Sequence, residues 1–362
     1  MDFSLVAQIF EVLRIAPPSK LVLLEAQTLS SAHVPPFPPD MPVLFTNVSS
    51  AELALQLKKM LLTTYPAEHD VVWVEGGKKK NGRLSELSCD SLGDDVCLYV
   101  PALGDGTSFE AFAEIVAHLR APDGCPWDKE QTHESLRKHL LEESYEAISA
   151  IDSGDFASMR EEFGDMLLQV VLQAQIANDE QKFNVNQVVQ GIYSKIVRRH
   201  PHVFGDVELN GVDGVLANWE KLKEQERKDN GQNEKGLLDG VPLALPALSQ
   251  AQEYQDRAAR VGFDWPEIEG VLDKIKEEIE EIKTAETDFE LASEIGDLFF
   301  AIVNLARWKK VDAESALRGT NMKFKKRFTY VEQGAKKQSR NLSDLTLEEM
   351  DALWNQAKQR GM

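Results

Sequence analysis

Cysteine is scarce in this sequence of 362 residues, which contains only Cys89, Cys97 and Cys125. No two of them have the CxxC spacing of a zinc site, and an odd number does not make a disulfide framework. We therefore expect a reducing, cytoplasmic location. Long apolar runs are also missing: none approaches the ~18 residues that a membrane-spanning helix needs. The N-terminus has no basic segment ahead of its apolar residues, so we predict neither a signal peptide nor a membrane span.

Positive charge is in short supply as well, because 40 Lys and Arg residues are set against 60 Asp and Glu, which gives a net charge of −20 at pH 7. Binding to nucleic acid over a broad surface requires clustered Lys and Arg, so we do not expect nucleic acid as a partner. The charge does not exclude a small anionic ligand held through metal ions. The hydrophobic fraction of 43% is ordinary for a folded soluble protein.

The first 105 residues have the pattern of a small α/β domain. Short β-branched runs at Val43–Val48, Val71–Val74 and Val96–Val100 predict strands, and the segment that starts at Ala51 predicts an amphipathic helix. The glycine- and lysine-rich Gly76–Gly82 lacks the GxxxxGK[ST] spacing, so it is interpreted as a surface hairpin loop and not as a phosphate cradle. From residue 106 helical periodicity dominates. We expect helices over 108–119, 130–152, 156–180, 185–199, 213–228, 245–260, 267–285, 288–309, 312–334 and 346–360, with a polar linker over 229–236.

The helical part contains an internal repeat. The acidic pattern EExxE at 142–146 returns at 277–281, and ExxD at 162–165 returns at 294–297. A Lys and an Arg four residues apart follow each acidic pair of motifs, and a Trp and a Lys four residues apart follow in turn. An interval of about 120–135 residues is too long for a solenoid unit and indicates a duplicated helical domain. The later pairs are Lys195/Arg199 and Trp219/Lys223 in the first repeat, and Lys323/Arg327 and Trp354/Lys358 in the second.

The acidic spacing predicts a metal site. Glu143 and Glu146 are three residues apart and share one helix face, as do Glu162 and Asp165 on the next helix. The break at Ser153–Asp155 allows the two helices to pack antiparallel, so that four carboxylates converge. Hard divalent cations offset the cost of burying such acids, and an all-oxygen set suits Mg²⁺ or Mn²⁺. Because Mg²⁺ often takes phosphate oxygens as further ligands, the pattern favours a phosphate-handling site.

Other interpretations exist for these motifs. A single EExxE on an amphipathic helix is usually a solvated face, but its recurrence among apolar neighbours argues against that here. Di-iron bundles use Glu-x-x-His, whereas the fourth residue of each motif here is Glu or Asp. A rival of a different class is a helical interaction or dimerisation module with solvated acids. A third is a sensor that binds nucleoside triphosphates with little turnover.

The basic pairs and the tryptophans are consistent with a nucleotide. A Lys and an Arg at i and i+4 lie on one helix face and can hold phosphate oxygens, with surface salt bridges as the alternative. A tryptophan can stack on any nucleobase, with ordinary packing as the alternative.

The repeated segments resemble a known family. "LRAPDGCPWDKEQTHESLRKHLLEESYEAISAID" and "REEFGD" in the first repeat, and "EEIEEI" and "SEIGDLFFAIVNLAR" in the second, resemble the MazG nucleoside triphosphate pyrophosphohydrolases, which are all-α NTP pyrophosphatases. The resemblance covers a first domain at 106–230 and a second at 237–362. It implies Mg²⁺-dependent hydrolysis of (d)NTPs to the monophosphate and pyrophosphate, with Mn²⁺ as the alternative ion, in nucleotide-pool housekeeping or stress control. It also implies a homodimer, and it leaves open whether the substrate is a standard nucleotide, a damaged nucleotide or an alarmone.

The resemblance also assigns residues. It implies phosphate binding by Lys323 and Arg327, a nucleotide pocket completed by Trp354 and Lys358, and a water-orienting or proton-accepting role for Glu277. In two-repeat members the second repeat is generally the active one, so we expect catalysis there. The implied metal ligands are Glu278, Glu281, Glu294 and Asp297, and their first-repeat matches are Glu143, Glu146, Glu162 and Asp165. The other first-repeat matches are Lys195, Arg199, Trp219 and Lys223.

Two positions depart from the family pattern, because Ser293 stands where another Glu is frequent and Asn304 has no counterpart in the first repeat. Residues 1–105 resemble the C-terminal half of a tetrapyrrole methylase domain, through "LSSAHVPPFPPDMPVL" and "LTTYPAEHDVVWV". The glycine-rich half of that domain is not in the sequence, so we expect no methyltransferase activity. The expected fold is mainly α, with two MazG-like helical-bundle repeats after a small α/β domain.

Overall fold

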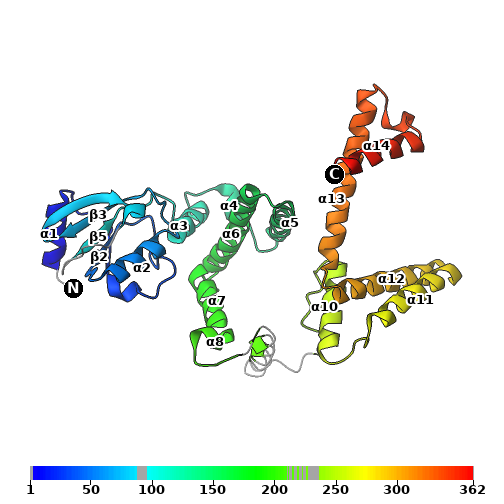
Figure 1. Cartoon of the computed structure of the whole chain (residues 1–362), viewed down its shortest axis with the longest axis horizontal. Coiled ribbons are helices and arrows are strands. Elements are labelled where there is room, and N and C mark those ends of the chain that lie inside the picture. The colour runs from blue at the N-terminus through cyan, green and yellow to red at the C-terminus, as the bar shows by residue number, and fades with distance from the viewer. Residues whose placement is uncertain are drawn as a thin grey trace. The chain divides into compact units, whose positions relative to one another are not determined.

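The computed structural model describes residues 3–87, 96–209, 211, 214, 215, 218, 219, 222, 226 and 236–361. Cys89, Lys223 and most of the expected 213–228 helix and 229–236 linker lie outside these residues. The chain divides into two compact units, Met1–Lys195 and Ile196–Met362, with the boundary inside helix α7 (Val185–Arg199) (Figure 1). None of the helices in the described ranges combines the length and the apolar character needed to cross a membrane.

A five-stranded sheet forms the centre of the N-terminal domain. Its strand order is β1-β2-β5-β3-β4, with β1 and β2 parallel and the other neighbours antiparallel. Both faces are covered, because alternate side chains of β2 point to opposite sides: Phe45 packs in the cluster that includes α2, and Leu44 packs in the cluster that includes α1. The elements are α1 (Phe3–Leu13), β1 (Val22–Glu25), β2 (Val43–Thr46), α2 (Ala51–Leu61), β3 (Asp70–Glu75), β4 (Lys78–Arg83) and β5 (Cys97–Val100).

The expected strands of this domain are confirmed to within two residues at their ends, and the expected helix after Ala51 is α2. The hairpin-loop prediction for Gly76–Gly82 is wrong beyond its first two residues. Gly76 and Gly77 make the turn with positive φ, but Lys78–Arg83 form β4, which pairs along its whole length with β3. Backbone pairing with a buried strand therefore determines the conformation of this lysine-rich segment, whose lysine side chains stay exposed.

The first repeat places two long helices side by side. Helix α5 (Arg137–Ser153) ends at Gly154, which takes the left-handed conformation (φ 69°), and Asp155 caps the N-terminus of α6 (Phe156–Asp179). The predicted helix break is thereby confirmed. The predicted start at residue 130 is wrong, because Thr132 and Ser135 exchange hydrogen bonds between side chains and backbone in a turn before α5. Helices α3 (Phe109–Arg120) and α4 (Pro126–Glu130) precede it, and α3 packs on α6 around Val116 and Leu172.

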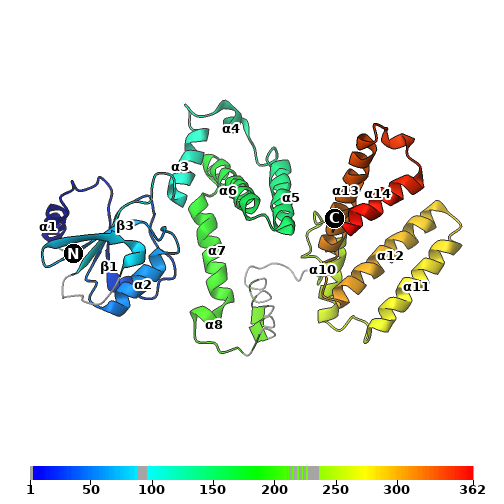
Figure 2. The same cartoon turned by 45° about the horizontal axis from the view of Figure 1, so that its top comes forward.

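The second repeat has a similar hairpin. Helix α11 (Ile268–Thr284) packs along α12 (Asp288–Trp308), whose start is fixed by a capping box between Thr287 and Glu290. Helix α10 (Ala247–Arg260) packs on α12 and α13 (Ala313–Lys337), and α14 (Leu347–Gln359) packs back on α13 (Figure 2). The short helix α8 (Pro201–Phe204) follows α7. The helices expected for this repeat are confirmed, with ends that shift by up to three residues.

Candidate functional site

The α11–α12 hairpin brings the second-repeat acids together. Carboxylate oxygens of Glu278, Glu294 and Asp297 lie within 4.8 Å of one another. Glu281 is outside this group but close to it: burial raises the pKa of Glu294 above its usual range, and the negative charges of Glu281 and Asp297 raise it further. Three of the four expected ligands therefore form one cluster, with the fourth beside it.

Glu278 is the acid whose surroundings are most unusual. Its side chain is almost fully enclosed, with the residue 2% exposed. Its Oε1 lies 2.7 Å from Lys274 Nζ, and the same ammonium lies 2.8 Å from Glu277 Oε1. The other oxygen, Oε2, is buried and has no hydrogen-bond partner in the described part of the chain. Buried polar atoms are nearly always paired, so an orphan carboxylate oxygen beside two further acids fits a hard divalent cation.

Lys274 is a site residue that the sequence reasoning missed. Its ammonium donates hydrogen bonds to Glu277 and Glu278, which raise its pKa above the usual range of a lysine, so it carries a positive charge at the acidic cluster. The sequence could have indicated this contact, because Lys274 stands four residues before Glu278 and therefore on the same helix face.

The first repeat assembles a similar but more open cluster. Oxygens of Glu143, Glu146 and Glu162 lie within 4.8 Å of one another. Asp165 is outside this group but close to it. Burial is the largest cause of the raised pKa of Glu143, and the negative charge of Asp165 is the second largest. None of these four acids is buried, in contrast to Glu278. They are less costly to maintain without a cation than the second-repeat set.

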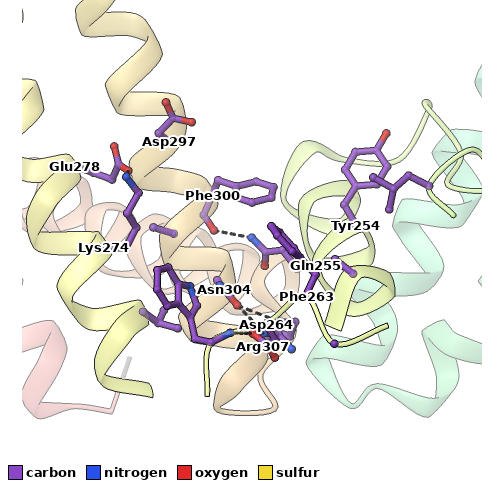
Figure 3. A pocket seen from close by; sticks show the side chains of 16 residues that line it. Tyr254, Gln255, Phe263, Asp264, Lys274, Glu278, Asp297, Phe300, Asn304 and Arg307 are labelled. Carbon is purple, nitrogen blue, oxygen red and sulfur yellow. Dashed lines mark hydrogen bonds and ion pairs between the residues drawn. The ribbon is translucent and has the colours of Figure 1, made fainter. Parts of the chain in front are cut away.

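A cavity of about 540 Å³ adjoins the second-repeat acids. Glu278, Asp297 and Lys274 line one end of it. Gln255 and Asn304 line the other end, where Figure 3 shows them apart from the acids. Aromatic and other apolar side chains from α10, α12 and the loop before α11 form much of the wall, namely Tyr254, Phe263, Trp265, Phe300 and Ala301. A mostly apolar cavity of this size with a few convergent polar groups is typical of small-molecule sites.

The predicted basic residues and the tryptophan of the second repeat lie on other helices than the acids. Lys323, Arg327, Trp354 and Lys358 lie on α13 and α14, and none of them lines the cavity. The Arg327 guanidinium lies over the Trp354 ring, 5.6 Å from its centroid, and the Phe324 ring lies 5.2 Å from the same ring. Within one chain, three of the acids therefore form one cluster, and Arg327 and Trp354 meet in a separate contact.

The first repeat keeps the same pairing of Arg and Trp. The Arg199 guanidinium lies 5.9 Å from the centroid of Trp219. It also makes a two-point ion pair with Glu226, at 2.6 and 3.2 Å, and this contact, together with a hydrogen bond from Arg198, lowers the pKa of Glu226 to about 2. Lys195 is exposed and belongs to the other unit of the chain.

Comparison with known proteins gives a consistent result. The model of the MazG nucleotide pyrophosphohydrolase domain matches residues 131–204 and again 267–331. The protein YabN of Bacillus subtilis, described as uncharacterized, is 40% identical over 97% of this chain and 73% of its own length. The nucleoside triphosphate pyrophosphohydrolase/pyrophosphatase MazG of Thermotoga maritima is 44% identical over 70% of this chain and 96% of its own length. The nucleoside triphosphate pyrophosphohydrolase of Escherichia coli is 44% identical over 68% of this chain and 95% of its own length.

The two matched segments contain the two acidic clusters, together with Arg199 in the first and Arg327 in the second. From the double match and from relatives whose length it almost fully covers, we conclude that the chain belongs to the MazG nucleotide pyrophosphohydrolase family.

Proposed function

We propose that this chain hydrolyses nucleoside triphosphates to the monophosphate and pyrophosphate, at the acidic cluster of the second repeat. The observation that carries the proposal is the buried Glu278, whose Oε2 has no partner among the described residues and which lines a cavity of about 540 Å³. The relatives from Thermotoga maritima and Escherichia coli are named for this activity. Proposed ligands for Mg²⁺, or for Mn²⁺ in its place, are Glu278, Glu281, Glu294 and Asp297.

The reaction assigns a task to each group of residues. A divalent cation at the acids would neutralise charge on the triphosphate and lower the pKa of a bound water. Glu277 is exposed on the same helix, one residue from Glu278, and is proposed to orient the attacking water and accept its proton. The water oxygen bonds to the α-phosphorus, the bond from that phosphorus to the α–β bridging oxygen breaks, and pyrophosphate leaves. Lys323 and Arg327 are proposed to bind phosphate oxygens.

Two observations support catalysis in the second repeat. Its acids include the buried Glu278, whereas all four first-repeat acids are at least partly exposed. A cavity of about 540 Å³ adjoins the second-repeat acids. We propose that the first repeat serves assembly or retains latent metal binding through its own cluster.

We also propose that the chain forms a homodimer. Large apolar side chains on α11 and α12 remain exposed around the acids, as Ile279, Ile295, Phe299 and Ile302 do. Exposed apolar side chains gathered on one hairpin are typical of a face covered by another chain. A second copy would also offer its own Lys323 and Arg327 to these acids, since neither residue lines the cavity of its own chain.

Co-expression of two differently tagged chains tests this arrangement. One chain carries Glu278→Gln and the other Arg327→Ala, and each is nearly inactive alone. If the acids of one copy work with the basic residues of the other, the purified mixed dimer contains one intact site and recovers up to about half of the wild-type activity. A mixed dimer with no activity would show that the acids and the basic pair act within one chain.

The proposed activity is tested by pyrophosphate release from a panel of ribo- and deoxyribonucleoside triphosphates, including damaged ones, with Mg²⁺ and with a chelator. Release that requires the metal supports the proposal. No turnover of any nucleotide would favour the helical interaction module, and tight binding without product would favour the sensor.

We place the activity in the cytoplasm because of the low cysteine content, and we assign no nucleic-acid partner because of the net charge of −20.

A further inference from the structure

We propose that the end of the cavity away from the acids binds the nucleobase of the substrate, and that Gln255 and Asn304 contact its hydrogen-bonding edge. This inference rests on the proposed function, in that it takes the triphosphate to lie at Glu278 and Asp297. Under this inference, the second repeat recognises the base of the substrate in addition to hydrolysing the triphosphate. The supporting observations are an oriented donor, an orphan acceptor and two exposed aromatic rings around one cavity.

The donor is the amide nitrogen of Asn304. Asn304 Oδ1 accepts hydrogen bonds from Arg307 Nε and Nη2, at 3.1 and 2.8 Å. A guanidinium can only donate, so the amide atom that faces Arg307 must be the oxygen, and the NH₂ group must face away from it. Arg307 is itself held by Asp264, at 2.5 Å. Asn304 lines the cavity, and the described residues contain no acceptor for its Nδ2. The amide donor therefore has a fixed orientation and an open hydrogen-bonding position.

The acceptor is the side-chain oxygen of Gln255. This residue is only 7% exposed, and its Nε2 donates to the carbonyl oxygen of Phe300 at 2.8 Å, which fixes the amide plane. Its Oε1 is buried and has no hydrogen-bond partner within the described ranges. An acceptor left unpaired in this way is uncommon in a folded protein unless water or a ligand satisfies it. Gln255 and Asn304 both line the cavity, and Figure 3 shows them apart from Glu278 and Asp297.

A donor and an acceptor at one end of a cavity match a nucleobase better than a phosphate. Bases present N–H donors next to carbonyl or ring-nitrogen acceptors on their Watson–Crick edges, and proteins read them by hydrogen bonds to that edge and by aromatic stacking. A phosphate has only acceptor oxygens at neutral pH, so the oxygen of Gln255 would repel it. Phe263 is 82% exposed and Trp265 is 45% exposed although both line the cavity, so their rings are accessible to a flat ligand.

The first repeat lacks this arrangement. When residues are counted from the Gly–Asp dipeptide that both repeats share, Leu172 stands at the position of Asn304, and Gln175 stands at the position of Arg307. The first repeat therefore has neither the amide donor nor the guanidinium that orients it. This explains why Asn304 has no counterpart in an otherwise similar pair of helices.

The substitution Asn304→Asp tests the inference with little change of shape. The aspartate keeps an oxygen for Arg307 to donate to, but it replaces the NH₂ donor that faces the cavity with an acceptor. We measure the Kd of ribonucleoside triphosphates and of inorganic tripolyphosphate by calorimetry in the full chain with Ca²⁺, and pyrophosphate release separately with Mg²⁺. Asn178→Asp makes the same chemical exchange at an exposed position of α6, outside the cavity, and is the control.

We expect Asn304→Asp to weaken nucleotide binding about tenfold or more, with unequal effects on the four bases, and to change tripolyphosphate binding less than twofold. The control should leave both affinities unchanged. Equal losses for nucleotides and tripolyphosphate, or no loss for either, would overturn the inference. If wild-type chain binds nucleotides with this dependence on Asn304 but releases no pyrophosphate, the proposed function fails and the inference stands. If wild-type chain binds no nucleotide, both fail.

Discussion

Replacement of Glu278 by glutamine should remove the stabilisation of the second repeat by Mg²⁺ while leaving the metal-free protein almost unchanged. The substitution preserves the shape of a side chain that is 2% exposed and removes its charge. In the absence of metal two effects oppose each other. The ion pair with Lys274 is lost, which destabilises the protein. The buried oxygen without a partner in the described chain is no longer charged, which stabilises it.

The magnitudes follow from the contacts. The Lys274 side chain is 37% exposed and keeps Glu277 at 2.8 Å, so loss of its contact with Glu278 costs on the order of 1 kcal/mol. Removing the charge from the unpaired buried oxygen stabilises the folded state by at least about 1 kcal/mol. The free energy of unfolding without metal should therefore change by less than about 1 kcal/mol. In contrast, Mg²⁺ at a hundred times its Kd should stabilise the wild-type site by about 2.7 kcal/mol if it binds as proposed. For a unit of this size that is a rise of about 5–10 °C in Tm.

Differential scanning calorimetry with and without Mg²⁺ measures both quantities. All proteins carry Glu146→Gln, so that the first-repeat cluster does not contribute to the shift. Glu280→Gln is the matched control, because it removes one charge from the same helix at a side chain that is 69% exposed and paired with Lys283. The control should keep the full metal-dependent rise in Tm, and Glu278→Gln should lose most of it. A rise in Glu278→Gln within about 1 °C of the control would refute our assignment of the cation to this carboxylate.

Other expectations concern the same acids. Asp297→Asn should reduce pyrophosphate release at least a hundredfold more than Asp165→Asn does, and the reverse order would move catalysis to the first repeat. Burial, followed by the charges of nearby acids, raises the pKa of Glu294 above 4.5. A cation binds the ionised form of the carboxyl group. As the pH is lowered, the Mg²⁺-dependent rise in Tm should therefore begin to shrink at a higher pH than it would with an ordinary glutamate. A rise in Tm that shrinks only near pH 4.5 would contradict this. Glu277→Gln should slow pyrophosphate release about a hundredfold while the metal-dependent Tm rise is kept, and an unchanged rate would remove its role.

The sequence predicts those parts of the site that depend on local geometry. Spacings of three residues put Glu278 and Glu281 on one face of α11, and Glu294 and Asp297 on one face of α12, and the loop between them lets the helices pack side by side. Three of these acids are accordingly found together. The contact between Arg327 and Trp354, in contrast, forms where α14 packs on α13, and the sequence did not predict it.

The remaining parts of the site depend on tertiary contacts that no spacing encodes. Gln255 belongs to a helix that precedes the acidic motifs, and it reaches the cavity only because α10 packs on α12. Asp264 meets Arg307 across 43 residues of sequence. Likewise, β4 is a strand because β3 pairs with it, although its own residues have low strand propensity.

Burial distinguishes the two copies of the motif more sharply than their sequences do. Both copies cluster three carboxylates within 4.8 Å, and both place an Arg over a Trp. The first-repeat acids are partly solvated, so water can offset their mutual repulsion and the fold tolerates them with or without a cation. Water cannot offset the repulsion at Glu278 in this way, because its Oε2 is buried and has no hydrogen-bond partner in the described chain. Buried polar atoms are nearly always paired, so the unpaired Oε2 of Glu278 favours a ligand at this carboxylate, and the unpaired Oε1 of Gln255 on the same cavity favours a ligand there as well.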